Sequence, residues 1–226
     1  MVIILNITLF GNNFILNFYL YLIMISIITG DIINSRKLPS SIWMDGLKRI
    51  LNAHGSQPKN WEIFRGDAFQ LEVSEPEEAM RIAIQIKAFL KTVKLDARMS
   101  IGLGDKTYDA SKISESNGTA FVRSGESFDQ LKKQKNTLAI NTGNGDFDNE
   151  INLMLRLAQT FMNNWLVQSA EFVLTAIENP TLSQEEMGVK LKINQAAVSR
   201  RRKRAQFDLI LELENHYREK IKSITP

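Results

Sequence analysis

Hydrophobic and polar positions follow two different periods along the chain. Between residues 24 and 145, short apolar runs typical of strands alternate with longer segments whose apolar residues recur every three or four positions. From residue 146 onward the helical period continues without strand-like runs. The pattern predicts an α+β domain over 24–145 and an all-α domain over 146–226.

The first domain has the predicted element order β-α-β-β-α-β-α-β. Its first strand ends in a turn at Gly30 and Asp31, and a tight hairpin turn follows at 65–68. The first six elements have the order of the split β-α-β unit, so we expect a ferredoxin-like domain. The predicted strands are 25–29, 61–64, 69–73, 97–103 and 138–140, and the predicted helices are 40–53, 76–92 and 120–133.

The second domain contains the most informative segment, residues 183–204. Ser183 has the place of a helix N-cap, and Glu186 three positions later completes a capping box. Gly188 is small where a second helix has to cross closely, and Asn194 caps that second helix. The segment resembles the helix-turn-helix of bacterial regulators, whose second helix enters the major groove of DNA.

Under this interpretation the second helix contacts DNA in two ways. Gln and Arg side chains pair with adenine and guanine edges, and a basic run neutralises phosphates. We therefore expect base-edge contacts from Gln195, Ala196, Ser199 and Arg200, and phosphate contacts from Arg201, Arg202, Lys203 and Arg204.

Two positions depart from the usual helix-turn-helix pattern. Lys192 stands where the turn normally has a glycine, and Arg201 falls on a position that faces inward. A helical bundle with a solvated basic face is the alternative to a DNA-binding unit. A DNA-binding unit of this kind reads two-fold sites as a homodimer. An apolar stripe that follows either packs on the rest of the chain or pairs with a second copy, and it consists of Ile210, Leu213, Tyr217 and Ile221.

Composition excludes several kinds of chemistry. With 44% hydrophobic and 23% charged residues the chain is globular rather than disordered. The absence of cysteine excludes disulfide frameworks, thiolate zinc sites and cysteine nucleophiles, and it fits a reducing compartment. The two histidines, His54 and His216, disfavour a multi-histidine metal site or a serine–histidine triad. Much of the basic character behind the net charge of +3 comes from the run 200–204.

Residues 1–23 contain no charged side chain. The stretch has the length of a membrane span, but its asparagines would place amides in hydrocarbon, and it lacks the basic start and cleavage site of a signal peptide. Met24 begins a plausible strand. We therefore expect translation to start at Met24 and the protein to be cytoplasmic and free of the membrane, with a membrane anchor in 1–23 as the alternative.

Asp31 and Asp67 are the candidate metal ligands. Each follows a glycine, and in a ferredoxin-like sheet the first strand and the hairpin meet at one edge. Two such carboxylates suit Mg²⁺ that carries nucleotide phosphates, although aspartate is also simply a common turn residue. Glycines let a ligand approach the backbone, here Gly30, Gly66, Gly102 and Gly104. The expected nucleotide-binding residues are Gly30, Ser35, Arg36, Lys37, Arg65 and Gly66.

Four short motifs carry a family resemblance. They are IITGDI at 27–32, FRGDAF at 64–69, MSIGLG at 99–104 and GTAF at 118–121. In this order they resemble class III nucleotidyl cyclases and GGDEF-type palms. With the helix-turn-helix downstream, nearly everything after residue 23 resembles the SatD family. The resemblance implies a cyclase-palm-like fold, with Asp31 and Asp67 at the family's metal positions.

The catalytic groups of cyclases do not carry over to this chain. Arg65 stands in place of the first glycine of the GGDEF motif, and Ala68 in place of its glutamate. The positions of the transition-state asparagine and arginine fall on Val122 and Glu126, and that of the base-selecting lysine near Ile63. Without donors for the developing charge, we expect poor turnover and assign no catalytic residue.

Three hypotheses of different classes follow. The first is a two-domain DNA-binding transcription regulator with a non-catalytic, cyclase-like sensor domain for a nucleotide and Mg²⁺. The second is an active metal-dependent nucleotidyl cyclase or nucleotidyltransferase whose C-terminal helices assemble a dimer. The third is an interaction module that binds neither nucleotide nor DNA. Product formation from ATP or GTP separates the second from the first, and DNA binding separates the third.

Overall fold

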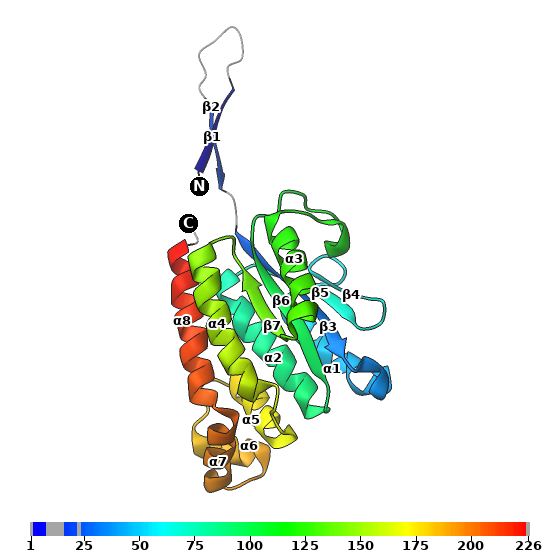
Figure 1. Ribbon diagram of the computed structural model, residues 1–226, viewed down its shortest axis with the longest axis vertical. Coiled ribbons are helices and arrows are strands. Elements are labelled where there is room, and N and C mark those ends of the chain that lie inside the picture. Colours follow the sequence, from blue (N-terminus) through cyan, green and yellow to red (C-terminus); the bar gives the residue numbers. More distant parts are fainter. Residues whose placement is uncertain (1, 8–15, 22–23, 225–226) are drawn as a thin grey trace.

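A five-stranded sheet flanked by helices forms the body of the protein (Figure 1). The computed structural model describes residues 2–7, 16–21 and 24–224. The sheet half contains, in chain order, β3 (Ile25–Ile33), α1 (Met44–Asn52), β4 (Trp61–Phe64), β5 (Ala68–Val73), α2 (Ala79–Thr92), β6 (Asp96–Gly104), α3 (Thr119–Gln134) and β7 (Leu138–Asn141). Short 3-10 helices lie at Ser35–Lys37, Ser40–Ile42, Pro76–Glu78 and Ile113–Glu115. The order of strands and helices is the predicted one.

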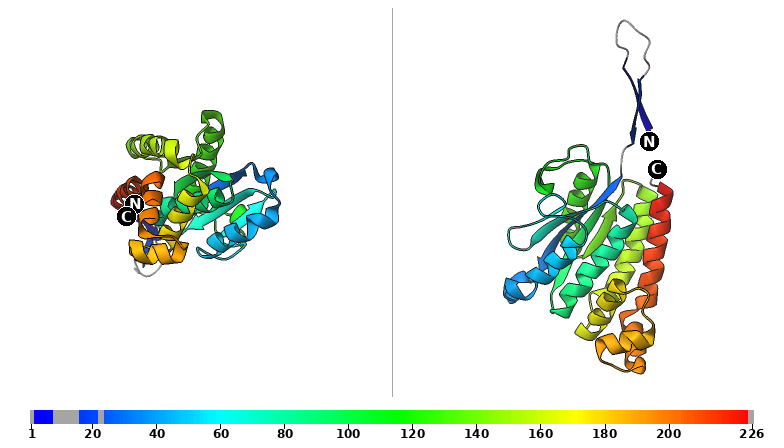
Figure 2. Two further views of the ribbon diagram at one scale, coloured as in Figure 1. Left: turned by 90° about the horizontal axis from the view of Figure 1, so that it is seen from below. Right: turned by 180° about the vertical axis from the view of Figure 1, so that it is seen from behind.

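Helices make up the part of the chain that follows β7. They are α4 (Gly145–Met162), α5 (Val167–Glu178), α6 (Gln184–Leu191), α7 (Gln195–Ala205) and α8 (Phe207–Ile224). The long helices α4 and α8 run side by side, and α6 and α7 lie together at one end of the molecule (Figures 1 and 2). α6 and α7 therefore form a distinct surface at that end of the molecule.

The sheet has the strand order β4-β5-β3-β6-β7. Neighbouring strands are antiparallel except β6 and β7, which are parallel. β3 is longer than the predicted strand 25–29, because Gly30 and Asp31 continue it instead of forming a turn. Gly30 pairs with Phe69 and Met99, so strands on both sides hold the backbone extended. The expected turn at this point is wrong.

Helices cover both faces of the sheet. α2 packs on one face, with α1 against it, and α3 packs on the other face. A Cβ added at Gly102 would lie 2.2 Å from the Ala120 carbonyl oxygen, and one at Gly104 would lie 2.6 Å from the Ala120 nitrogen. These two glycines therefore admit α3 rather than the ligand that the sequence suggested.

The free edge of β7 is covered by side-chain amides of α4. Gln159 accepts hydrogen bonds from the Thr137 and Leu138 nitrogens and donates one to the Leu138 carbonyl. Asn152, two helical turns earlier, accepts from the Ile140 nitrogen and donates to the Ile140 carbonyl. The two amides take the place of a further strand, because an edge strand otherwise leaves its backbone groups unpaired.

The buried apolar core crosses the predicted domain boundary without a break. One cluster contains residues of the sheet, of α1 and α2, and of all five C-terminal helices. The apolar stripe of α8 belongs to it, since Ile210, Tyr217 and Ile221 are almost completely buried within the single chain and Leu213 nearly so. Tyr217 also donates a hydrogen bond to the Pro76 carbonyl in the 3-10 helix before α2. Of the two roles expected for this stripe, packing on the rest of the chain is the one observed.

The first 23 residues are described only in part. β1 (Val2–Ile7) and β2 (Leu16–Tyr21) pair antiparallel in a sheet of their own, which stands apart from the body (Figure 1). The rest of this segment lies outside the described residues, so a start at Met24 and a membrane anchor both stay predictions. Among the described residues, no helix combines the length and the apolar character needed to cross a bilayer.

Candidate functional site

The segment from α6 to α7 is built by local signals. The Ser183 hydroxyl accepts from the Glu186 nitrogen, and the Glu186 carboxylate accepts from the Ser183 nitrogen, which completes the predicted capping box. The Asn194 side chain accepts from the Ala197 nitrogen and begins α7 as expected. Lys192 ends α6 with φ 56° and ψ 43°, so a lysine takes the left-handed conformation that usually favours glycine.

Close contact between the turn and α6 depends on Gly188. A Cβ at this position would lie 2.8 Å from the Ile193 carbonyl oxygen, closer than Cβ atoms approach a backbone oxygen. Met187 and Val198 are buried beside it. The small residue therefore fixes how α7 leaves the turn, as its position in the sequence indicated.

α7 has one exposed face and one packed face. Residues Val198, Arg201 and Ala205 lie on the packed side, where Val198 and Ala205 are fully buried. Positions three and four apart share a face of a helix. The exposed face consists of two adjoining rows, Gln195, Ser199 and Lys203 in one, and Ala196, Arg200 and Arg204 in the other.

Two of the expected phosphate contacts are engaged within the chain. The Arg201 guanidinium donates to the Glu171 carboxylate on α5 at 3.0 Å. Arg202 donates to Asp208 at 2.8 Å and lies over the Phe207 ring. These two arginines fasten α7 to α5 and α8, and the exposed cations of α7 are Arg200, Lys203 and Arg204.

The second candidate site is a cavity of 700 Å³ at the end of β3 and the β4–β5 hairpin. Asp31 and Asp67 both line it, together with Gly30 and Arg65. Ser35 touches its margin by donating a hydrogen bond to Asp67 at 2.6 Å. Arg36 and Lys37 of the 3-10 helix Ser35–Lys37 and Gly66 of the hairpin turn are exposed and do not line this cavity. The structure thus brings both predicted carboxylates to one place but only part of the predicted nucleotide site.

Cations, rather than further carboxylates, surround Asp31. Its Oδ2 accepts from Arg98 at 3.2 Å and lies 3.9 Å from the Lys132 ammonium. Burial raises the pKa of the Asp31 carboxyl above its ordinary value, while Arg98 and Lys132 counteract this effect and Asp67 adds to it. Within the described part of the chain, Asp31 Oδ1 is buried without a hydrogen-bond partner.

This arrangement fits Mg²⁺ poorly. The ion prefers several oxygen ligands, and the two cations beside Asp31 would repel it. Among the described residues, no group of three or more His, Cys, Asp or Glu side chains could hold a metal ion. The sequence offered no signal for Arg98 and Lys132, because the strand register and the position of α3 bring them to Asp31.

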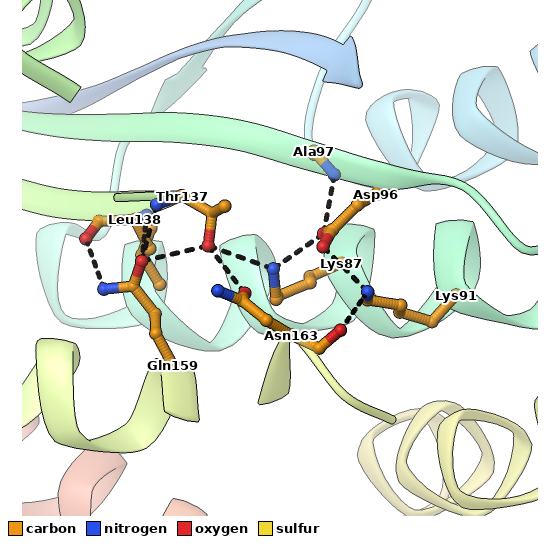
Figure 3. A network of polar contacts seen from close by, with 8 residues as sticks. All are labelled: Lys87, Lys91, Asp96, Ala97, Thr137, Leu138, Gln159 and Asn163. Carbon is orange, nitrogen blue, oxygen red and sulfur yellow. Dashed lines mark hydrogen bonds and ion pairs between the residues drawn. The ribbon is translucent and has the colours of Figure 1, made fainter. Parts of the chain in front are cut away.

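A buried lysine lies at the centre of a polar cluster apart from the two candidate sites (Figure 3). Lys87 of α2 is fully buried and donates to Asp96 at 2.6 Å and to Thr137 at 3.2 Å. Lys91 binds the other oxygen of Asp96 and the Asn163 carbonyl. Burial lowers the pKa of Lys87 to about 8, against the attraction of Asp96. The cluster joins α2, β6, β7 and the end of α4 without facing either candidate site.

Comparisons with known proteins give one distant likeness. No protein-family model and no curated protein matches the chain. Among solved structures, a bacterial light-regulated adenylyl cyclase is similar with a TM-score of 0.35 and 14% sequence identity. The match covers 54% of this chain and 43% of that one, so the chain spans less than half of the cyclase's length. A likeness this distant does not establish a shared activity, and it does not support the SatD family in particular.

Proposed function

We propose that the protein binds duplex DNA, with α6 and α7 as a helix-turn-helix and α7 as the recognition helix. The observation that carries the proposal is the exposed face of α7. It places Gln195, Ser199 and Arg200, which suit base edges, beside the cations Lys203 and Arg204. The opposite face of the same helix is buried or tied by ion pairs, so the exposed face is held in a fixed orientation.

In this proposal the sheet half is a non-catalytic domain. Its strand order and directions agree with a ferredoxin-like arrangement to which β7 is added, and this supports the cyclase-like and SatD-like interpretation of the motifs. Binding of a nucleotide with Mg²⁺ at Asp31 and Asp67 stays a prediction, and the cations beside Asp31 speak against the metal. A cytoplasmic location also stays a prediction.

A homodimer remains part of the proposal, but through a different surface from the stripe of α8. Leu153 and Leu157 of α4 and Leu209 of α8 are at least half exposed. Leu157 and Leu209 line a groove between these neighbouring helices together with apolar residues such as Met154 and Phe161, and Leu153 lies one helical turn before Leu157. Mutual burial of this surface in two copies would present two recognition helices to a two-fold DNA site.

The test is a titration of the full chain with duplex DNA at several salt concentrations. We expect Lys203→Gln and Arg204→Gln each to weaken binding to all sequences and to reduce the slope of log affinity against log salt by roughly one unit. Arg200→Gln should instead relax the preference at one base position, at a cost of roughly 1–3 kcal/mol on the preferred site. Lys133→Gln removes an equal charge on α3 and should change neither quantity.

Three results would contradict the proposal. Folded protein that fails to retain DNA even at low salt would leave the basic face of α7 as a solvated surface. Equal loss of affinity in Lys133→Gln and Lys203→Gln would show that only the overall charge matters. Formation of a cyclic nucleotide or dinucleotide from ATP or GTP, abolished by Asp31→Ala or Asp67→Ala, would favour the enzyme hypothesis instead.

A further inference from the structure

A cavity of 440 Å³ lies where α6 and α7 meet the rest of the chain. Met187 of α6 and Val198 of α7 line one side, and Phe172 of α5 and Leu211 of α8 line the other. Closely packed protein interiors contain few voids larger than a water molecule. The walls combine apolar side chains with polar and charged ones, and a cavity of this volume is instead typical of a site for a small molecule.

Three arginines line this cavity, namely Arg81 of α2, Arg202 of α7 and Arg218 of α8. Arg202 is paired with Asp208, and Arg218 is paired with both Glu78 and Glu214. The charge of these two arginines is therefore balanced within the chain. Arg81 has the weakest carboxylate contact of the three, so it favours an anionic group on a molecule that enters.

Arg81 is the arginine best placed to bind such a group. Its contacts among the described residues are a 3.3 Å hydrogen bond to the Ile177 carbonyl and a 3.6 Å ion pair with Glu78. Both distances are long for charge-assisted hydrogen bonds. Since a guanidinium carries five N–H donors, Arg81 has donors left for a carboxylate, sulfonate or phosphate.

We propose that this cavity binds a small organic anion with an apolar body. The anionic group binds the Arg81 guanidinium, and the apolar body fills the space beside Phe172 and Leu211. Such a ligand would contact α2, in the sheet half, and α7 at once. It would thereby act on the orientation of α7 from the packed side, opposite the exposed Arg200. This regulatory part rests on the proposed DNA binding, whereas the binding site itself does not.

The first experiment measures binding to the full chain with two fluorescent probes. 1-Anilinonaphthalene-8-sulfonate combines an apolar body with an anionic group, and N-phenyl-1-naphthylamine has a closely similar body without the anion. We expect saturable binding of both. Arg81→Gln should weaken the sulfonate probe at least about tenfold, the loss expected for a charge-assisted hydrogen bond, and change the neutral probe less than about twofold.

Filling the cavity provides the second test. Ala176→Met on α5 and Leu211→Phe on α8 each enlarge a side chain that lines the cavity, so one variant serves if the other fails to fold. Each should weaken both probes strongly. Leu157→Ser, in the separate groove between α4 and α8, is the matched control and should weaken neither.

Specific outcomes would overturn the binding site. One is loss of probe binding in Leu157→Ser with normal binding in a folded, cavity-filled variant, which would place the probes in the other groove. Another is an equal effect of Arg81→Gln on the charged and the neutral probe, which would exclude recognition of the anion.

The regulatory part is tested by retention of labelled duplex DNA on a filter. Saturating sulfonate probe should change the DNA affinity of the wild-type chain several-fold and leave that of a folded, cavity-filled variant unchanged. Equal DNA affinity with and without probe, while fluorescence shows the cavity filled, would overturn the regulation but not the site. Failure to retain DNA at all would defeat the proposed function, and the fluorescence result would still stand.

Discussion

Lys87 illustrates how single residues couple the layers of this protein. Its ammonium is fully buried, yet Asp96 and Thr137 provide hydrogen-bond partners from β6 and from the start of β7. Asp96 has further partners in Lys91 and in the Ala97 nitrogen, so the carboxylate would not be left alone without Lys87. Replacing Lys87 therefore removes the buried ammonium without leaving the Asp96 carboxylate unpaired.

We predict that Lys87 makes stability depend on pH in the alkaline range. Burial lowers its pKa to about 8 in the folded protein, against 10.5 for an ordinary lysine. Between these values the unfolded chain binds more protons than the folded one, so this lysine's contribution to the free energy of unfolding rises with pH. From pH 7 to 9.5, wild type should gain roughly 2 kcal/mol relative to Lys87→Met in urea unfolding. Parallel curves for the two proteins would contradict a lowered pKa.

At the scale of elements, local signals predicted more than long-range ones. The capping residues Ser183, Glu186 and Asn194 act within one helical turn, so the sequence alone locates α6 and α7. The turn expected at Gly30 was wrong because pairing with two flanking strands overrides the local preference of glycine and aspartate for turns. The cationic neighbours of Asp31 could not be predicted either, because Arg98 and Lys132 belong to elements far from it in the sequence.

The amide pairing between α4 and the edge of β7 could not be predicted from the sequence either, because Gln159 follows Leu138 by 21 residues. We predict that Gln159→Leu lowers the free energy of unfolding by roughly 3 kcal/mol, because it removes the partners of the backbone groups of buried Leu138 and half-buried Thr137. Urea unfolding measures the loss, with Gln168→Leu at an exposed position of α5 as the matched control. A loss no larger than in this control would mean that water or a backbone shift satisfies the edge.

At the scale of the whole molecule, the sheet half and the helical half depend on each other for burial. α2 of the sheet half packs against α5 of the helical half, and α8 contacts the 3-10 helix Pro76–Glu78 before α2. Arg218 of α8 binds Glu78 there as well. The sequence predicted a boundary at 145–146 because the period of the pattern changes there, but a change of period marks secondary structure and not the limit of a core.

We therefore predict that both halves unfold in one cooperative transition. Trp43 and Trp61 are buried in the sheet half and Trp165 in the helical half, so tryptophan fluorescence reports each half in turn. In Trp165→Phe the signal comes from the sheet half, and in the double variant Trp43→Phe/Trp61→Phe it comes from the helical half. Within each variant, the urea midpoint from fluorescence should equal that from far-ultraviolet circular dichroism, which follows the whole chain. Separate midpoints in either variant would instead support two independently stable domains divided near residue 145.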